Sequence, residues 1–242
     1  MSVEGYWGHD DYSEGVEISG SFDDVPESLD LDVSASNTNS DSMYWGETYD
    51  GESVLIKDGS ADFGNAVPAN LFLYSVFKDT CVDVPKTGYS EESNLLYIEP
   101  LDGLDTSVEG LDQGDKTELL ESVAAKALIG DSDFVRNIGY IAEEDSYAVI
   151  DPDRAGAPLS SIEDEILDFI ESMNRMTSME VDRSEFMGAV DKVSGEVDQD
   201  DLRQSLSELR PLTEDLPFYA NFEESFIMDN FRSPEKYLFD DV

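Results

Sequence analysis

The net charge constrains this chain more than any other feature of its sequence. The chain carries 57 Asp and Glu residues against 14 Lys and Arg residues, so its formal net charge is −43. Repulsion among so many carboxylates opposes a compact state and ordinarily predicts disorder. However, 40% of the residues are apolar and 10% are aromatic, which is enough for the core of one large or two small domains. We therefore expect a folded chain whose surface charge is screened by its surroundings.

The choice of charged residues favours a salt-rich setting. At molar salt the Debye length falls to about 3 Å, so carboxylates repel one another weakly while still keeping the chain soluble. Lys is rare, at seven residues, and Asp outnumbers Glu by 32 to 25, as is typical of haloarchaeal proteins. We expect a cytoplasmic protein of a halophilic host. The alternative is an acidic mimic of nucleic acid, which should gather its carboxylates on one face.

The composition also excludes several classes of function. Binding to nucleic acid or to anionic lipid needs a basic surface, which 14 scattered cations do not provide. Cys81 is the only cysteine and His9 the only histidine, so a disulfide framework and a Cys/His zinc site are both excluded. His9 lies in an acidic, Gly-rich run, which disfavours Ser-His-Asp and Cys-His catalysis. No apolar run approaches the length of about 18 residues that spans a membrane.

Three segments of different texture follow one another along the chain. Residues 1–42 are poor in Leu and Ile and rich in Ser, Asp, Glu and Gly, and we interpret them as an acidic arm that contacts the body or a protein partner. Residues 43–103 contain aromatic and β-branched runs; those at 43–49 and 53–57 are joined by an Asp-Gly turn, which predicts a β-hairpin. Residues 104–242 are mainly helical in pattern. The sequence therefore predicts an α+β chain with a small β-rich lobe followed by a helical large lobe.

Apolar spacing predicts the individual elements. A helix should run from Pro68 to about Asp79, two short strands should lie within 89–99, and glycines mark 101–114 as a loop. The period then becomes helical over 115–128 and gives way to strands. The remaining predicted elements are strands at 138–141 and 147–150 and four helices with apolar stripes at Ile162–Met173, Phe186–Val193, Leu202–Leu209 and Phe218–Phe226.

Polar side chains suited to phosphoryl transfer follow the helix at 115–128 and the last of these strands. Asp131, Asp133 and Asn137 lie in the loop after the helix, and Asp151 lies at the strand end. In such reactions one carboxylate orients the acceptor hydroxyl, while an amide oxygen and a second carboxylate hold Mg²⁺ against the phosphates. In so acidic a chain each Asp alone could instead be a turn or cap residue.

The order of these motifs resembles a known superfamily. Gly-Asp-x-Asp-x-x-x-Asn after a helix, then a hairpin, then Ile-Asp-x-Asp, is similar to the catalytic and metal-binding loops of the protein-kinase-like superfamily. HipA-like kinases, phosphatidylinositol-kinase-like proteins and aminoglycoside phosphotransferases are the branches it resembles. Val54-Leu55-Ile56-Lys57 looks like the third strand of that fold's small lobe, and residues 65–78 look like its helix.

The resemblance implies an ATP- and Mg²⁺-dependent phosphotransferase whose acceptor is unknown. Lys57 would hold the nucleotide phosphates, and Asn137 and Asp151 would bind the metal. Asp133 would be the catalytic base, with Asp131 as the competing candidate. These roles are implied by the resemblance alone.

The chain departs from the superfamily pattern at three points. The spacing to Asn137 is four residues from Asp133 and six from Asp131, where the family usually has five. The helix at 65–78 contains no Glu to pair with Lys57, and no Gly-rich loop precedes the hairpin. These departures motivate an alternative function, a kinase-like protein that has lost catalysis and serves as a structural or interaction component of an assembly, such as a haloarchaeal virus particle.

Overall fold

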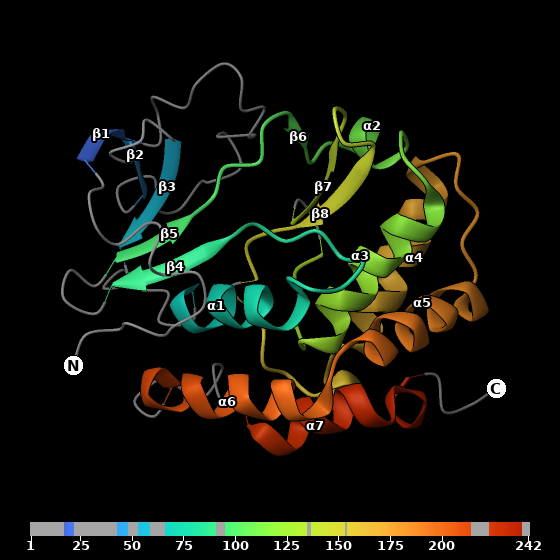
Figure 1. The fold of residues 1–242 in the computed structure, drawn as a ribbon. Coiled ribbons are helices and arrows are strands. Elements are labelled where there is room, and N and C mark those ends of the chain that lie inside the picture. Colours follow the sequence, from blue (N-terminus) through green and yellow to red (C-terminus); the bar gives the residue numbers. More distant parts are fainter. Residues whose placement is uncertain are drawn as a thin grey trace.

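A computed structural model describes residues 17–21, 43–47, 53–58, 66–90, 95–134, 137–152, 154–213 and 223–238 of the chain. Within these residues the chain forms small antiparallel sheets and a larger helical portion (Figure 1). From residue 159 onward every described element is a helix. The predicted α+β class is confirmed.

Five strands form the first sheet in the spatial order β1-β2-β3-β5-β4, and all neighbours are antiparallel. The strands are β1 (Glu17–Ser21), β2 (Met43–Glu47), β3 (Ser53–Asp58), β4 (Thr87–Ser90) and β5 (Leu95–Ile98). β2 and β3 form the predicted hairpin, with Trp45 opposite Leu55. β3 is buried on both faces, because Leu55 joins the main core while Val54 and Ile56 form a smaller cluster with Tyr97. Its β-branched residues suit this central position.

The strand β1 lies within the segment 1–42 that the composition sets apart as an arm. It pairs with β2 from Glu17 opposite Glu47 to Ser21 opposite Tyr44. Its sequence, Glu-Ile-Ser-Gly-Ser, has no alternation of apolar and polar residues, so pairing with β2 rather than local propensity accounts for the strand. The rest of the arm, including residues 34–42, lies outside the described residues.

The helix α1 (Ala66–Phe77) follows β3 and lies between β4 and α6 (Gln199–Thr213), as Figure 1 shows. It confirms the helix predicted from Pro68, and it begins two residues earlier. None of its residues is charged. Leu71, Phe72 and Phe77 are fully buried. A helix that is apolar around its circumference must be covered on both sides, and β4 and α6 provide that cover.

The second sheet has three antiparallel strands in the order β6-β7-β8. They are β6 (Leu104–Asp105), β7 (Ile138–Ile141) and β8 (Ser146–Val149), and the short helix α2 (Val108–Leu111) follows β6. The hairpin of β7 and β8 was predicted. β6 and α2 fall in the stretch 101–114 that its glycines marked as a loop. The two residues of β6 are too few to show alternation, and their pairing with β7 makes them a strand.

Long helices complete the fold, and α3 lies at their centre (Figure 1). They are α3 (Lys116–Leu128), α4 (Glu163–Met176), α5 (Arg183–Glu196), α6 and α7 (Glu224–Arg232), with short 3₁₀ turns at Leu159–Ser161 and Pro234–Lys236. α3 contacts α5, β8 and α7, and its residues 119–128 are all buried. The apolar stripes predicted for α4, α5 and α6 face the core.

The aromatic stripe predicted at the last helix differs from the structure. Phe226 is 41% exposed, whereas Ile227 and Phe231 are buried. Phe218 and Phe222 lie outside the described residues. α7 begins only at Glu224, so the stripe that the sequence suggested does not continue through the described helix, and its buried face is shifted by one residue.

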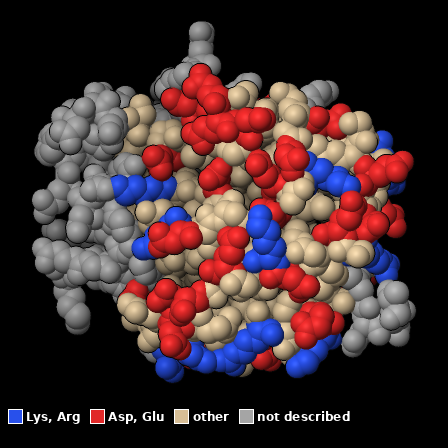
Figure 2. Space-filling view, turned by 45° about the vertical axis from the view of Figure 1, so that its right-hand side comes forward, with Lys and Arg blue, Asp and Glu red and all other residues tan. Residues whose placement is uncertain are grey.

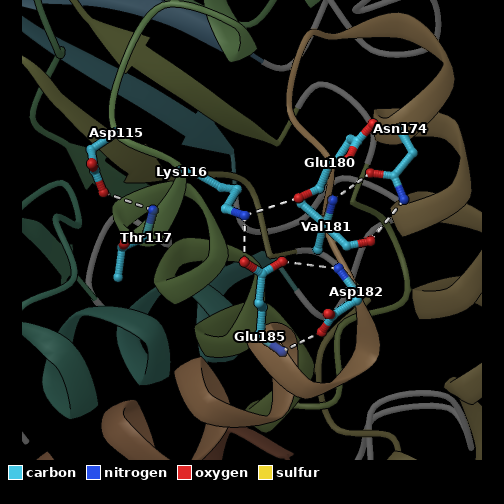
Figure 3. Close-up of polar contacts among 8 residues, drawn as sticks. All are labelled: Asp115, Lys116, Thr117, Asn174, Glu180, Val181, Asp182 and Glu185. Carbon is cyan, nitrogen blue, oxygen red and sulfur yellow. Dashed lines mark hydrogen bonds and ion pairs between the residues drawn. The ribbon is translucent and has the colours of Figure 1, made fainter.

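Polar contacts join the loop between α4 and α5 to the start of α3 (Figure 3). Lys116 Nζ donates to the carbonyl of Glu180 at 2.9 Å and to Glu185 Oε1 at 2.5 Å. The hydrogen bond from Lys116 lowers the pKa of the Glu185 carboxyl. Asn174 closes the same loop, since its side chain accepts from the Val181 amide (2.7 Å) and donates to the Val181 carbonyl (2.8 Å).

Acidic side chains are spread over the face in Figure 2 and are interspersed with Lys and Arg. On this face the acidic side chains lie in several groups, with Lys and Arg side chains between them. Within the described part of the chain, no helix has both the length and the apolar character needed to cross a membrane.

Candidate functional site

Lys57 and Asp151 form an ion pair between segments 94 residues apart in the sequence. Lys57 extends from β3 in the first sheet, and Asp151 comes two residues after β8 in the second. The Lys57 side chain is 13% exposed and the Asp151 side chain is 43% exposed. The carboxylate can therefore be reached from solvent, while the ammonium is mostly covered by the protein.

Asp151 has a left-handed backbone conformation, with φ of 48°. Residues other than Gly adopt this conformation uncommonly, although Asp and Asn tolerate it best. Asp145 also has a positive φ, 54°, but it lies in the turn between β7 and β8, where such a conformation is expected. At Asp151 the chain is leaving a strand, and a strained residue held at such a place is typical of a functional site.

A ring of polar contacts surrounds the loop between α3 and β7. Lys126 Nζ donates to Asp131 Oδ2 (2.6 Å), and Asp131 Oδ1 accepts from the Asp133 amide (2.9 Å). Asn137 Nδ2 donates to the Asp133 carbonyl (3.2 Å), and the Asn137 carbonyl accepts from the Ile150 amide (3.0 Å). A long contact of 3.5 Å from Lys126 Nζ to the Ile150 carbonyl closes the ring. Because Ile150 directly precedes Asp151, this one network includes Asp131, Asp133 and Asn137 and ends beside Asp151.

The ion pair of Lys126 and Asp131 is completely buried, since both side chains are 0% exposed. Burial raises the pKa of the Asp131 carboxyl, and the Lys126 ammonium and the Asp133 amide oppose that shift. Both carboxylate oxygens have hydrogen-bond partners. A carboxylate in this setting has no open path to a substrate hydroxyl.

The segment after Asp151 is fastened to the start of the same loop. Gly156 donates its amide hydrogen to the Ile129 carbonyl (2.8 Å), and Ala157 donates to the Gly130 carbonyl (3.1 Å). Gly130 has φ of +71°, and a Cβ atom there would lie 1.9 Å from the Ala157 carbonyl oxygen. Only glycine permits so close an approach, so the Gly in the Gly-Asp-x-Asp motif serves the packing of two loop segments.

Asn230 of α7 joins the same region from the C-terminal part of the chain. It is 1% exposed and makes three hydrogen bonds. Its Nδ2 donates to the carbonyls of Leu128 (3.2 Å) and Ala157 (3.1 Å), and its Oδ1 accepts from the Leu159 amide (3.0 Å). Asn230 thus connects the end of α3 to the segment that follows Asp151.

The structure brings the five candidate residues into two connected groups. Lys57 contacts Asp151, and Asn137 is hydrogen-bonded to Asp133, whose amide is bonded to Asp131. The Asp133 carboxylate makes no hydrogen bond within the described part of the chain, and its residue is partly exposed. Asp131 differs from the rest, because it is buried and paired with a lysine.

Sequence reasoning missed Lys126 and Asn230. A signal for Lys126 was present, because its spacing of seven from Leu119 and three from Val123 places it on the apolar face of α3. A lysine on such a face requires a buried partner. Asn230 gave no comparable signal, since its role depends on carbonyls more than 70 residues away.

Comparisons with known proteins add little to this geometry. No protein-family model matches the chain. No curated protein matches it. Among solved structures it is similar to the crystal structure of CtkA, a proinflammatory kinase of Helicobacter pylori, with 12% identity and a TM-score of 0.48, over 82% of this chain and 88% of that chain. Similarity at this level decides neither a fold family nor an activity.

Proposed function

We propose that the chain is an ATP- and Mg²⁺-dependent phosphotransferase of kinase-like fold. The observation that carries this proposal is the ion pair between Lys57 and Asp151, which joins the two sheets across 94 residues. Asn137 lies beside the same strand end through its bond to Ile150. Lys57, which would hold the phosphates, therefore lies close to Asp151 and Asn137, which would bind the metal. Phosphoryl transfer requires these groups to lie close together.

The order of the elements supports the same proposal. The strand that bears Lys57 is followed by a buried helix, two further strands and a short connection to the second sheet. The residues that resemble the small lobe of the kinase-like superfamily thus occupy one antiparallel sheet with its helix, and α3 with the hairpin after it carries the catalytic-type loop.

The candidate residues fit a magnesium ion by the chemistry of their donor atoms. Mg²⁺ prefers oxygen ligands and needs only one or two from the protein when phosphates supply others. Asp151 offers a carboxylate that is 43% exposed, and Asn137 keeps its Oδ1 without a hydrogen bond within the described residues while Nδ2 is held by Asp133. When bound, the ion would neutralise charge on the phosphates. Within the described part of the chain no group of three His, Cys, Asp or Glu side chains is arranged to hold a metal.

The protein's own residues would divide the remaining work. Lys57 would hold the nucleotide phosphates, exchanging its carboxylate partner for phosphate oxygens. Asp133 is the better candidate for orienting the acceptor hydroxyl, because its carboxylate is partly exposed, whereas Asp131 is buried against Lys126. A base must lie within hydrogen-bond reach of the proton that it accepts.

A matched pair of variants tests the proposal. Asp151→Asn removes the charge at a residue with φ of 48°, and Asp145→Asn makes the same change at a residue with φ of 54°. Asn tolerates this conformation as Asp does, so both variants should fold. We expect calorimetry in molar KCl to detect Mg-ATP binding in the wild type and in Asp145→Asn but not in Asp151→Asn. Equal binding by all three proteins would contradict the assignment of Asp151.

A second function is favoured by the composition of α1. This helix has no acidic residue, so it offers no carboxylate to hold Lys57 in a catalytic position, and Lys57 pairs with Asp151 instead. A kinase-like protein that has lost catalysis and acts within an assembly accounts for this feature. On that hypothesis Mg-ATP should not raise the melting temperature of the wild type, and hydrolysis or transfer of the γ-phosphate would exclude it.

A further inference from the structure

We infer that Lys126 and Asp131 are positioning residues that hold the catalytic-type loop and the Asp151 strand end in register with each other. The catalytic significance of this inference rests on the proposed function. Where the two segments are held can be measured separately from nucleotide binding.

Stability alone is a poor explanation for this ion pair. Both side chains are 0% exposed, and they lie 2.6 Å apart. The attraction between two buried charges often fails to repay the loss of their hydration, so apolar side chains of similar volume serve as well or better for stability. A buried ion pair at such a place calls for a role in specifying structure.

The remaining contacts of the pair indicate that role. Asp131 Oδ1 accepts from the amide of Asp133, so the carboxylate fixes the backbone of the residue proposed as base. Lys126 Nζ lies 3.5 Å from the carbonyl of Ile150, which directly precedes Asp151. Lys126 is itself anchored in α3, a helix of 13 residues in the middle of the core. One rigid helix therefore fixes the positions of both the catalytic-type loop and the strand end that precedes Asp151.

A second ion pair on α3 provides a matched control. Lys192 Nζ contacts Glu121 Oε1, also at 2.6 Å, and joins α5 to α3. The Lys192 side chain is 49% exposed, and the pair makes no contact with the loop in any described hydrogen bond. Replacing Lys192 removes an ion pair of the same length that α3 makes through Glu121, and it leaves the candidate site unchanged.

The experiment compares the variants Lys126→Met, Lys126→Met/Asp131→Asn and Lys192→Met with the wild type in molar KCl. The double variant removes both buried charges and retains an acceptor for the Asp133 amide, so it should fold even if the single variant does not. Hydrogen exchange is measured over residues 129–134 and 150–151, with α6 as the internal reference. Mg-ATP affinity is measured by calorimetry.

Exchange in both loop segments of the double variant should be about tenfold faster, because a hydrogen-bonded link to the buried helix is lost. Its Mg-ATP affinity should fall about tenfold or more, as it does when groups that orient metal ligands are removed. Lys192→Met should leave both quantities unchanged.

The two readouts separate this inference from the proposed function. If the wild type does not bind Mg-ATP, the proposed function fails, and faster exchange in the double variant alone would still support the positioning role. If the double variant exchanges at the wild-type rate in both segments, or if Lys192→Met accelerates them equally, the positioning role is overturned.

Discussion

Replacing Asn230 by alanine should lower the free energy of unfolding by about 3 kcal/mol. Asn230 is 1% exposed, and its amide makes three hydrogen bonds, to the carbonyls of Leu128 and Ala157 and from the amide of Leu159. The substitution leaves all three backbone groups without this partner. These groups belong to the end of α3 and to the segment after Asp151, so the loss acts on the scaffold of the candidate site.

The magnitude follows from the number of groups left unsatisfied. A buried polar group without a partner costs about 1–3 kcal/mol, and the lower end of that range applied to three groups gives about 3 kcal/mol. The cavity left by the missing amide adds to this cost. A loss of this size is a large fraction of the stability of an ordinary domain, which is about 5–15 kcal/mol.

Asn174 offers a control with the same chemistry in a different environment. Its side chain also accepts from one amide and donates to one carbonyl, both of Val181, but Asn174 itself is exposed. Water can replace part of what Asn174→Ala removes, so we expect a loss of about 1 kcal/mol or less. Denaturant unfolding in molar KCl measures both variants. Equal losses for Asn230→Ala and Asn174→Ala would refute the reasoning that burial sets the cost.

Two further predictions concern Gly130 and Tyr147. Gly130→Ala should destabilise the protein by about 3 kcal/mol or more, because its φ is +71° and the new Cβ would lie 1.9 Å from the Ala157 carbonyl oxygen. Gly188→Ala should stabilise the protein, because Gly188 lies in α5 and a Cβ added there would have no atom within 4 Å. If the unfolding midpoints of the two variants moved in the same direction, both predictions would be contradicted. Burial raises the pKa of Tyr147 to about 12 from 10.0, so its contribution to stability is full below pH 10 and is lost as the pH rises towards 12. Between pH 10 and 12 the free energy of unfolding should fall less steeply with pH in Tyr147→Phe than in the wild type. An equal slope in the two proteins would show that Tyr147 is not responsible for the loss.

The sequence predicted the elements whose pattern is local. The hairpin of β2 and β3 follows from two runs of aromatic and β-branched residues joined by an Asp-Gly turn, and α3 follows from apolar residues at helical spacing. The α+β class follows from the change of period along the chain. These features depend on residues close together in the sequence, so the information needed to predict them is present in short windows.

The sequence indicated candidate residues and only part of their arrangement, and the roles of these residues are proposals. The resemblance to a kinase-like order indicated Lys57, Asn137 and Asp151, and the structure brings Lys57 into contact with Asp151. It did not indicate which of Asp131 and Asp133 is buried. That difference depends on Lys126, which was hidden among the apolar residues of α3.

The sequence by itself determined the charge of −43, the exclusion of disulfide and Cys/His zinc sites, and most of the strands and helices. Only the tertiary structure decided that β1 joins the first sheet, that Asp131 is sealed against Lys126, and that Asn230 ties the end of α3 to the segment after Asp151. The reason is that a buried polar group needs hydrogen-bond partners, and these partners can lie far away in the chain. No local sequence pattern indicates which of them will come into contact.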